Sequence, residues 1–351
     1  MIANAVFTIA DALLVAGALA WVAKRRDAPA FLRSFVWAGV LSMIGAVALS
    51  ANGFQFFRHV AVFVFVLLPL YLAGSAALLF RRDRRLAAAV AVGALGLVAV
   101  GVDAFLVEPE RLEVTRHRMT TAKLRTPLRI AVLSDLQTDA PGEYERRAIR
   151  LALAERPDVI LLPGDFIQIG DPEAYARAAA DLRQIFVSEG LRAPLGVYAV
   201  GGNTDGPGWR TVFEGLPVQA FTETVRHRQG PIGVLALSME DSRTGDVRDA
   251  SPSDLFEIVV GHYPDFALGG VRGDLLVAGH THGGQVQLPG WGPLLTFSRV
   301  PRAWAAGGLF PIPGNRTLVV SRGIGMERAE APRLRFLCRP EVVIIDVEPE
   351  E

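Results

Sequence analysis

The chain has 351 residues, of which 51% are apolar, and its formal net charge is zero. A neutral chain lacks the basic excess typical of nucleic-acid binding, so we expect no nucleic-acid partner. A single cysteine, Cys338, excludes an internal disulfide and a cysteine-rich zinc site, and its place beside the apolar run Val342–Asp346 favours a small buried residue. Apolar residues are concentrated before about Val107, so we expect the chain to divide there.

Four apolar stretches in the first third each approach the ~20 residues that a membrane-crossing helix needs. They are Ala5–Ala23, Phe35–Ala51, His59–Phe80 and Leu86–Val107. Residues 1–107 are therefore predicted to form a four-helix transmembrane anchor. We interpret its two intramembrane carboxylates, Asp11 and Asp103, as structural; a transport role for the helices would rest on these two residues alone.

The polar breaks between these stretches differ in charge. The first contains Lys24, Arg25, Arg26 and Arg33, the third contains Arg81, Arg82, Arg84 and Arg85, and the middle break, Asn52–Arg58, contains one arginine. By the positive-inside rule the first and third breaks lie in the cytoplasm. We therefore expect an integral protein of the bacterial inner (cell) membrane with both termini, and everything after Val107, on the extracytoplasmic side.

Residues 108–127 form a polar connection, predicted to be a linker with a short alternating segment, Leu112–Arg118. Beyond it, residues 128–351 contain short runs rich in Val, Ile and Leu, which is typical of strands buried on both faces. These runs are Leu128–Leu133, Val159–Leu162, Gly196–Val200, Ile232–Leu237, Phe256–Val260, Leu275–Ala278, Thr317–Val320 and Val342–Val347.

Helical spacing of apolar residues predicts helices over Glu143–Glu155 and Pro172–Val187. Strands first alternate with helices and then follow one another through loops. This order predicts a layered α/β domain in which two sheets pack face to face between helices. The long loops of Pro289–Pro313 are rich in Gly, Pro and Trp, which is where binding surfaces are often built.

Five polar motifs follow predicted strands directly. They are Ser134–Gln137, Gly164–Asp165, Gly202–Asp205, Gly261–Asp265 and Gly279–Gln285. Because open α/β sheets bind ligands beyond the carboxyl ends of their strands, we expect these motifs to meet. Three histidines, His262, His280 and His282, lie in the last two motifs, and we assign no role to His59, His117 or His227.

Two carboxylates and three imidazoles make a mixed oxygen and nitrogen ligand set of the kind that binds divalent metals. His280 and His282 are two residues apart, and we expect a strand to direct both imidazoles to the same side. Two divalent ions about 3.5–4 Å apart would polarise a phosphoryl oxygen and activate water near neutral pH. The motifs thus indicate a two-metal site for phosphoryl chemistry.

The order of the motifs, from Asp135-Leu136-Gln137 to Gly279-His280-Thr281-His282, resembles the calcineurin-like metallophosphoesterases. The Gly-Gly-Gln ending of the last motif and the stretch Cys338–Glu341 are similar to the membrane-associated bacterial branch of that superfamily, which includes phospholipid-type phosphoesterases and UDP-2,3-diacylglucosamine hydrolases. The resemblance covers the chain from about Leu112 to its end. It implies a four-layer αββα sandwich.

The resemblance also implies two divalent ions, drawn from manganese, magnesium, iron and zinc, and a set of site residues. One ion would be held by Asp135, Gln137, Asp165 and His282, and the other by Asp165, Asn203, His262 and His280, with Asp165 bridging. The same resemblance implies Asn203, Thr204 and Asp205 as catalytic residues.

Two positions depart from the family pattern, which has histidine where this chain has Gln137 and Thr204. An amide oxygen is a harder and weaker ligand than imidazole, so we favour manganese over zinc. Thr204 replaces the proposed leaving-group acid, a role worth ~10²–10⁴ in rate, so substrates with good leaving groups should suffer least. Asp139 could substitute in either role. Three arginines are candidate phosphate contacts or surface residues: Arg299, Arg302 and Arg322.

The sequence therefore predicts a membrane-anchored hydrolase that cleaves a phosphodiester or pyrophosphate bond in a phosphorylated small molecule or a lipid-linked, cell-envelope substrate. The alternative is a catalytically degenerate module that binds phosphorylated ligands and signals through its helices. A module that has lost its activity would be expected to lack both family histidines, and this chain has Gln137 and Thr204 at those positions.

Overall fold

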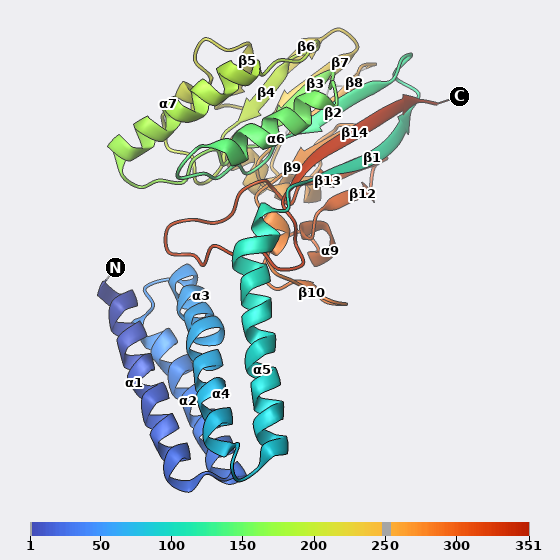
Figure 1. Ribbon diagram of the computed structural model, residues 1–351. Coiled ribbons are helices and arrows are strands. Elements are labelled where there is room, and N and C mark those ends of the chain that lie inside the picture. Colours follow the sequence, from blue (N-terminus) through green and yellow to red (C-terminus); the bar gives the residue numbers. More distant parts are fainter. Residues whose placement is uncertain (1, 248–253, 351) are drawn as a thin grey trace. The chain divides into compact units, whose positions relative to one another are not determined.

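The computed structural model describes residues 2–247 and 254–350, and these form two compact units (Figure 1). The helical unit contains the chain up to Val107 together with Ala329–Arg333. The α/β unit contains Glu108–Arg328 and the segment from Leu334 onward. Each unit is described by itself below.

Four helical segments are long and apolar enough to cross a membrane, namely Ala3–Arg25, Ala28–Leu49, Gly53–Leu79 and Arg84–Glu110, and all but the last three residues of the fourth belong to the helical unit. Their helices are α1 (Ile2–Arg25), α2 (Ala28–Leu49), α3 (Gly53–Val62), α4 (Leu68–Leu79) and α5 (Arg84–Val102). A π-helical turn, Phe63–Leu67, joins α3 to α4 just before Pro69, whose missing N–H disturbs the helical hydrogen bonds. A second π turn, Asp103–Val107, and a 3₁₀ turn, Glu108–Glu110, follow α5.

Polar side chains at the breaks start each new helix. Asp27, Asn52 and Asp83 cap α2, α3 and α5 by accepting a hydrogen bond from the backbone N–H three residues on. Within the bundle, Asp11 is buried and accepts a hydrogen bond from the Ser42 hydroxyl of α2, so its contact is between helices.

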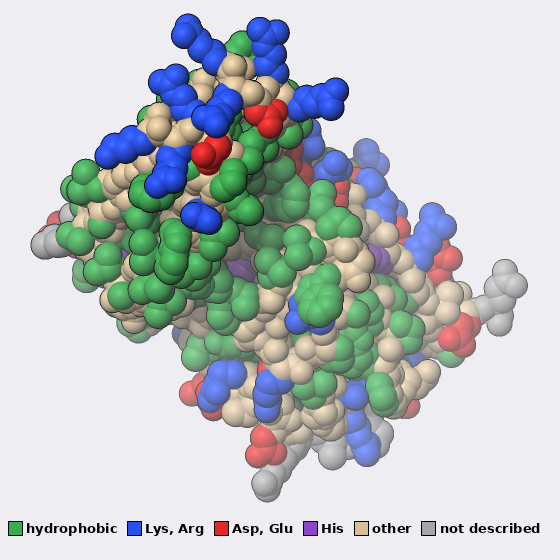
Figure 2. Space-filling model, turned by 90° about the horizontal axis from the view of Figure 1, so that it is seen from below, with side chains coloured by type: hydrophobic (Ala, Val, Ile, Leu, Met, Phe, Trp, Pro, Cys, Tyr) green, Lys and Arg blue, Asp and Glu red, His purple; other side chains and the backbone are tan. Residues whose placement is uncertain are grey.

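Figure 2 shows a cluster of Lys and Arg side chains at one end of the helical unit, while hydrophobic side chains cover its flank. The Arg82 guanidinium donates to the Arg25 carbonyl oxygen at 3.2 Å, which places the first and third breaks together. The charge that the positive-inside rule assigns to the cytoplasm therefore lies on a single end of the bundle.

The α/β unit is built on two six-stranded sheets and a small hairpin (Figure 1). The first sheet has the order β1 (Glu113–Thr121), β14 (Glu341–Pro349), β2 (Leu128–Val132), β3 (Val159–Leu162), β4 (Val197–Val200), β5 (Val218–Phe221). The second has the order β12 (Gly308–Ile312), β13 (Arg316–Val320), β9 (Leu275–Ala278), β8 (Phe256–Val260), β7 (Ile232–Ala236), β6 (Val225–Gln229). The hairpin is β10 (Gln287–Leu288) with β11 (Gly292–Pro293). All eight predicted strands are present, with ends within two residues.

Side-chain alternation along the strands produces four layers. In β2, Ala131 packs toward the helices α6 (Glu143–Ala154) and α7 (Pro172–Glu189), whereas Ile130 and Val132 face the second sheet. The outer face of the second sheet is covered by short elements, the 3₁₀ turn Pro264–Leu268 and the helix α9 (Arg302–Ala305), and the helix α8 (Met239–Thr244) packs against the same turn. The predicted αββα sandwich is confirmed.

The structure differs from the prediction for residues 108–127. This segment contains β1, which pairs in parallel with β14 from Glu113↔Glu341 to Thr121↔Pro349 and so forms an edge of the first sheet. Exposed and half-buried residues alternate along β1, which is the pattern of an edge strand with one face in solvent. Only Arg111 and Leu112 therefore lie between the span that ends at Glu110 and the first strand.

The two basic breaks lie at the same end of the helical bundle. The orientation of the chain in the membrane can therefore be tested. We expect a C-terminal fusion to alkaline phosphatase, which needs an oxidising compartment, to be active in cells, and a C-terminal fusion to green fluorescent protein to be dark. Fusions made after Arg82 should behave in the opposite way. Phosphatase activity after Arg82 together with fluorescence at the C-terminus would reverse the assigned orientation.

Candidate metal centre

The five polar motifs follow β2, β3, β4, β8 and β9, so the carboxyl ends of both sheets contribute to one site. Asp135, Asp165 and His282 are buried, and each offers a ligand atom within 4.8 Å of the others. His282 Nε2 lies 3.8 Å from Asp135 Oδ1. These three side chains form the first group of candidate ligands.

A second group is formed by Asn203, His262 and His280. Asn203 Oδ1 lies 2.8 Å from both His262 Nε2 and His280 Nδ1, and these two nitrogens are 3.2 Å apart. The other ring nitrogens carry the hydrogens, because His262 Nδ1 donates to the Pro163 carbonyl at 2.8 Å and His280 Nε2 donates to the Phe297 carbonyl at 3.1 Å. Three lone pairs thus converge with no hydrogen between them, which suits a cation.

Asp165 connects the two groups. Its Oδ2 lies 3.4 Å from His262 Nε2, and its carboxylate also belongs to the cluster with Asp135 and His282. A carboxylate in this position can share its two oxygens between two ions.

Burial sets the protonation of the site. It raises the pKa of Asp165 to about 7, and burial together with the proximity of Asp165 raises the pKa of Asp135 to about 7. Burial and the nearby His262 lower the pKa of His280 to about 3, and burial lowers the pKa of His282 well below its usual value. Neutral imidazoles beside buried carboxylates are ready metal ligands, and negative charge buried without a cation is costly.

Unpartnered atoms point to the same conclusion. Among the described residues, neither ring nitrogen of His282 has a hydrogen-bond partner, although both are buried. Buried polar atoms are almost always hydrogen-bonded, so an unpartnered imidazole at this position fits metal ligation. The residues present therefore fit divalent ions.

Gln137 has a buried Oε1 with no partner among the described residues, while its Nε2 donates to Gln168 Oε1 at 2.9 Å. The orientation of both amides follows from Arg328, whose backbone N–H donates to the same Gln168 atom at 2.6 Å, so that atom is an oxygen. Gln168 Nε2 in turn donates to Glu327 Oε2 at 2.9 Å. Gln137 thus has its oxygen free to bind an ion.

Gln168 and Glu327 were not identified from the sequence, because neither belongs to a recognisable motif. The available signal was the position of Gln168, three residues after Asp165 in the loop that follows β3. Glu327 lies in a loop far along the chain, and no sequence pattern connects it to the site.

The three residues predicted as catalytic occupy different positions. Asn203 belongs to the second ligand group, and the Thr204 backbone N–H donates to Asp165 Oδ1 at 2.8 Å. The Asp205 carboxylate accepts hydrogen bonds at 2.8 Å from the backbone N–H groups of Asp165, Phe166 and Gly202. Asp205 therefore ties the loop after β3 to the loop after β4.

The backbone at the site is strained. Asp135, Gln137, Asp165, His280 and His282 all have positive φ angles, between 37° and 69°. A non-glycine residue in this region costs about 1–3 kcal/mol, and such residues cluster at functional sites. The prediction that a strand aligns His280 and His282 was wrong, because β9 ends at Ala278 and left-handed turns bring both residues into the site.

The remaining candidates have partners of other kinds. Asp139 lies 3.6 Å from the Arg328 guanidinium, Arg299 pairs with Asp265 at 2.9 Å, and Arg322 pairs with Glu341 at 2.5 Å. Cys338 is buried, as predicted, with its Sγ 3.3 Å from the His282 carbonyl oxygen.

Comparison with known proteins identifies relatives over most of the chain. The family model of calcineurin-like phosphoesterases matches residues 128–284. The phosphodiesterase YaeI of Escherichia coli is 30% identical over 255 residues, covering 68% of this chain and 90% of the relative. The uncharacterized metallophosphoesterase YkuE of Bacillus subtilis is 29% identical over 286 residues, covering 74% and 94%. The UDP-2,3-diacylglucosamine pyrophosphatase LpxG of Chlamydia trachomatis is 24% identical over 307 residues, covering 68% and 90%.

The motif glycines permit the close approach of the ligand loops. A Cβ on Gly279 would lie 2.0 Å from Ser134 Oγ and 2.4 Å from Asp135 Oδ2. Gly279→Ala should therefore displace Asp135 and weaken binding of Mn²⁺ by about tenfold or more, measured by calorimetry on the full chain in detergent. Gly270→Ala is the matched control, because no atom of the residues that the structure describes lies within 4 Å of its added Cβ. Equal Mn²⁺ affinity in the two variants would contradict this role.

Proposed function

Because the chain belongs to the family of calcineurin-like phosphoesterases, we propose that it is a membrane-anchored, metal-dependent hydrolase that cleaves a phosphodiester or pyrophosphate bond in a lipid-linked or cell-envelope substrate. The observation that carries the proposal is the position of Asp165, whose carboxylate lies against both groups of candidate ligands. Two ions that share this carboxylate would stabilise the negative charge that develops on the phosphoryl group during hydrolysis.

In this proposal Asp135, Gln137, Asp165 and His282 would hold one divalent ion, and Asp165, Asn203, His262 and His280 would hold the other. When bound, such ions polarise the phosphoryl oxygens and lower the pKa of water. Manganese is favoured because the first set includes the amide oxygen of Gln137. Water adds its oxygen to phosphorus, the bond from phosphorus to the leaving oxygen breaks, and a proton ends on the leaving oxygen.

The protein's own contribution is to hold this ligand set rigid. The Pro163 and Phe297 carbonyls fix the ring orientation of His262 and His280, and Asp205 fixes the loop that carries Asp165. Preorganised groups need no rearrangement as charge develops on the phosphoryl oxygens, which is the main source of rate in such reactions.

A groove of about 640 Å³ beside the candidate ligands offers room for a substrate. It is lined by Arg243, Tyr263, Phe297 and Arg299, among others, and the Tyr263 ring lies 4.0 Å from that of His280 between ring centres. Arg299 pairs with Asp265, which also lines the groove, and Arg243 pairs with Glu240, so both arginine charges are partly compensated. The lipid-linked nature of the substrate is supported by the four candidate spans and by the relative named as a UDP-2,3-diacylglucosamine pyrophosphatase.

The proposal is tested with bis(p-nitrophenyl) phosphate and the full chain in detergent. Hydrolysis should be abolished by EDTA and restored by Mn²⁺, and Asp165→Asn should lower turnover by roughly a hundredfold or more, because both ions lose a shared ligand. The control is Asp181→Asn, an exposed carboxylate on α7, which should behave like the parent protein. Turnover that needs no metal, or that survives Asp165→Asn, would exclude this function.

Thr204 favours the second candidate, a binding module without catalytic activity, because threonine cannot protonate a leaving alkoxide at neutral pH. The double substitution Gln137→His, Thr204→His separates the two. If the chain is a working enzyme for good leaving groups, this variant should lose activity on a pyrophosphate diester, because histidine would disturb the Gln137–Gln168 pair. A rise of about a hundredfold or more from a near-zero baseline would instead identify a degenerate enzyme.

A further inference from the structure

The α/β unit exposes large apolar side chains mainly in one place. Ten such residues are exposed in the described part of this unit, and six of them lie in one loop and a neighbouring segment. We call these six the apolar rim: Leu288, Trp291, Leu294, Leu295, Phe297 and Leu337. Trp291 and Phe297 are 63% and 61% exposed, which is costly for aromatic side chains in water.

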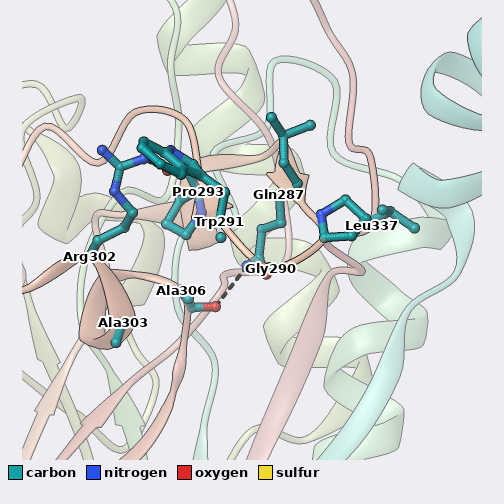
Figure 3. Close-up of a pocket in the computed structure, with 11 residues that line it drawn as sticks. Gln287, Gly290, Trp291, Pro293, Arg302, Ala303, Ala306 and Leu337 are labelled. Carbon is teal, nitrogen blue, oxygen red and sulfur yellow. Dashed lines mark hydrogen bonds between the residues drawn. The ribbon is translucent and has the colours of Figure 1, made fainter.

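Three residues of the apolar rim, Leu288, Trp291 and Leu337, line a groove of about 490 Å³ at the hairpin of β10 and β11. The other three follow in the same loop, after β11. Figure 3 shows Trp291 and Arg302 together on one side of this groove and Leu337 on the other. The Arg302 guanidinium lies over the Trp291 ring, 5.0 Å from its centre, and also donates to the Pro293 carbonyl at 2.7 Å. The groove thus combines apolar walls with one fixed cation.

The loop that carries the rim is joined to the metal centre. The Phe297 carbonyl accepts the hydrogen bond that orients His280, and a Cβ on Gly284 would lie 2.5 Å from the Pro293 side chain. The Gln287 side chain bonds to the Gly283 and Ala306 carbonyls and holds the base of the hairpin. Any surface that the apolar rim contacts is therefore close to the candidate metal ligands.

We propose that the apolar rim inserts into the interfacial layer of the lipid bilayer, with Arg302 contacting lipid phosphate. Tryptophan, phenylalanine and leucine with an adjacent arginine make up the composition that partitions into this layer. The chain cannot carry the α/β unit far from the bilayer, because two residues between Glu110 and β1 span at most about 7 Å. This contact with the membrane is independent of catalysis; its use in presenting a lipid-linked substrate rests on the proposed function.

The test uses the full chain reconstituted in vesicles of phosphatidylethanolamine and phosphatidylglycerol. Trp291→Cys and, separately, Leu294→Cys are labelled with an environment-sensitive fluorophore, and Val187→Cys, an exposed apolar site on α7, is the matched control. The natural Cys338 is fully buried, so only the introduced cysteine should react with the fluorophore in a folded chain. A count of one labelled thiol per chain therefore verifies that each variant has folded.

We expect brominated lipids to quench the labels at 291 and 294 at least about threefold more than the label at 187, and aqueous iodide to show the reverse order. Iodide quenching at 291 and 294 equal to that at 187 would overturn the proposal. Labels shielded from both quenchers would also overturn it, because a protein surface and not lipid would then cover the rim.

Discussion

Two carboxylates, Asp135 and Asp165, are buried side by side, and this constraint governs the site. Burial raises the pKa of each to about 7, so the unaided pair resists ionisation. The surrounding imidazoles do not compensate by protonation, since burial lowers the pKa of both His280 and His282. Bound cations would supply the missing positive charge, and the neighbouring lone pairs are oriented to receive them.

The fold serves this constraint by joining two sheets at their carboxyl ends. Loops after β2, β3 and β4 approach those after β8 and β9, and Asp205 ties two of the loops together through backbone N–H groups. Left-handed turns at Asp135, Asp165 and His282 aim the side chains inward. The strain of these turns is offset by the packing of the sheets, where strand residues such as Ile130 and Val260 are completely buried.

Much of this could be predicted from the sequence, because buried strands are apolar on both faces and the polar motifs interrupt them abruptly. β1 was missed as a strand since its partner, β14, lies at the other end of the chain, and local pattern does not report long-range pairing. The strand β6 was missed because Arg226, His227 and Arg228 make it polar. Gln168 was missed because its role arises from Arg328 and Glu327, which meet it only in the folded chain.

The short connection formed by Arg111 and Leu112 has a consequence for kinetics. A catalytic unit that begins within two residues of a membrane span samples a thin shell above the bilayer and not the bulk solvent. For any lipid-linked substrate, encounters then occur by lateral diffusion in two dimensions. The governing variable becomes the mole fraction of substrate in the surface, so diluting the vesicles should leave turnover unchanged while diluting the lipid with inert lipid should slow it.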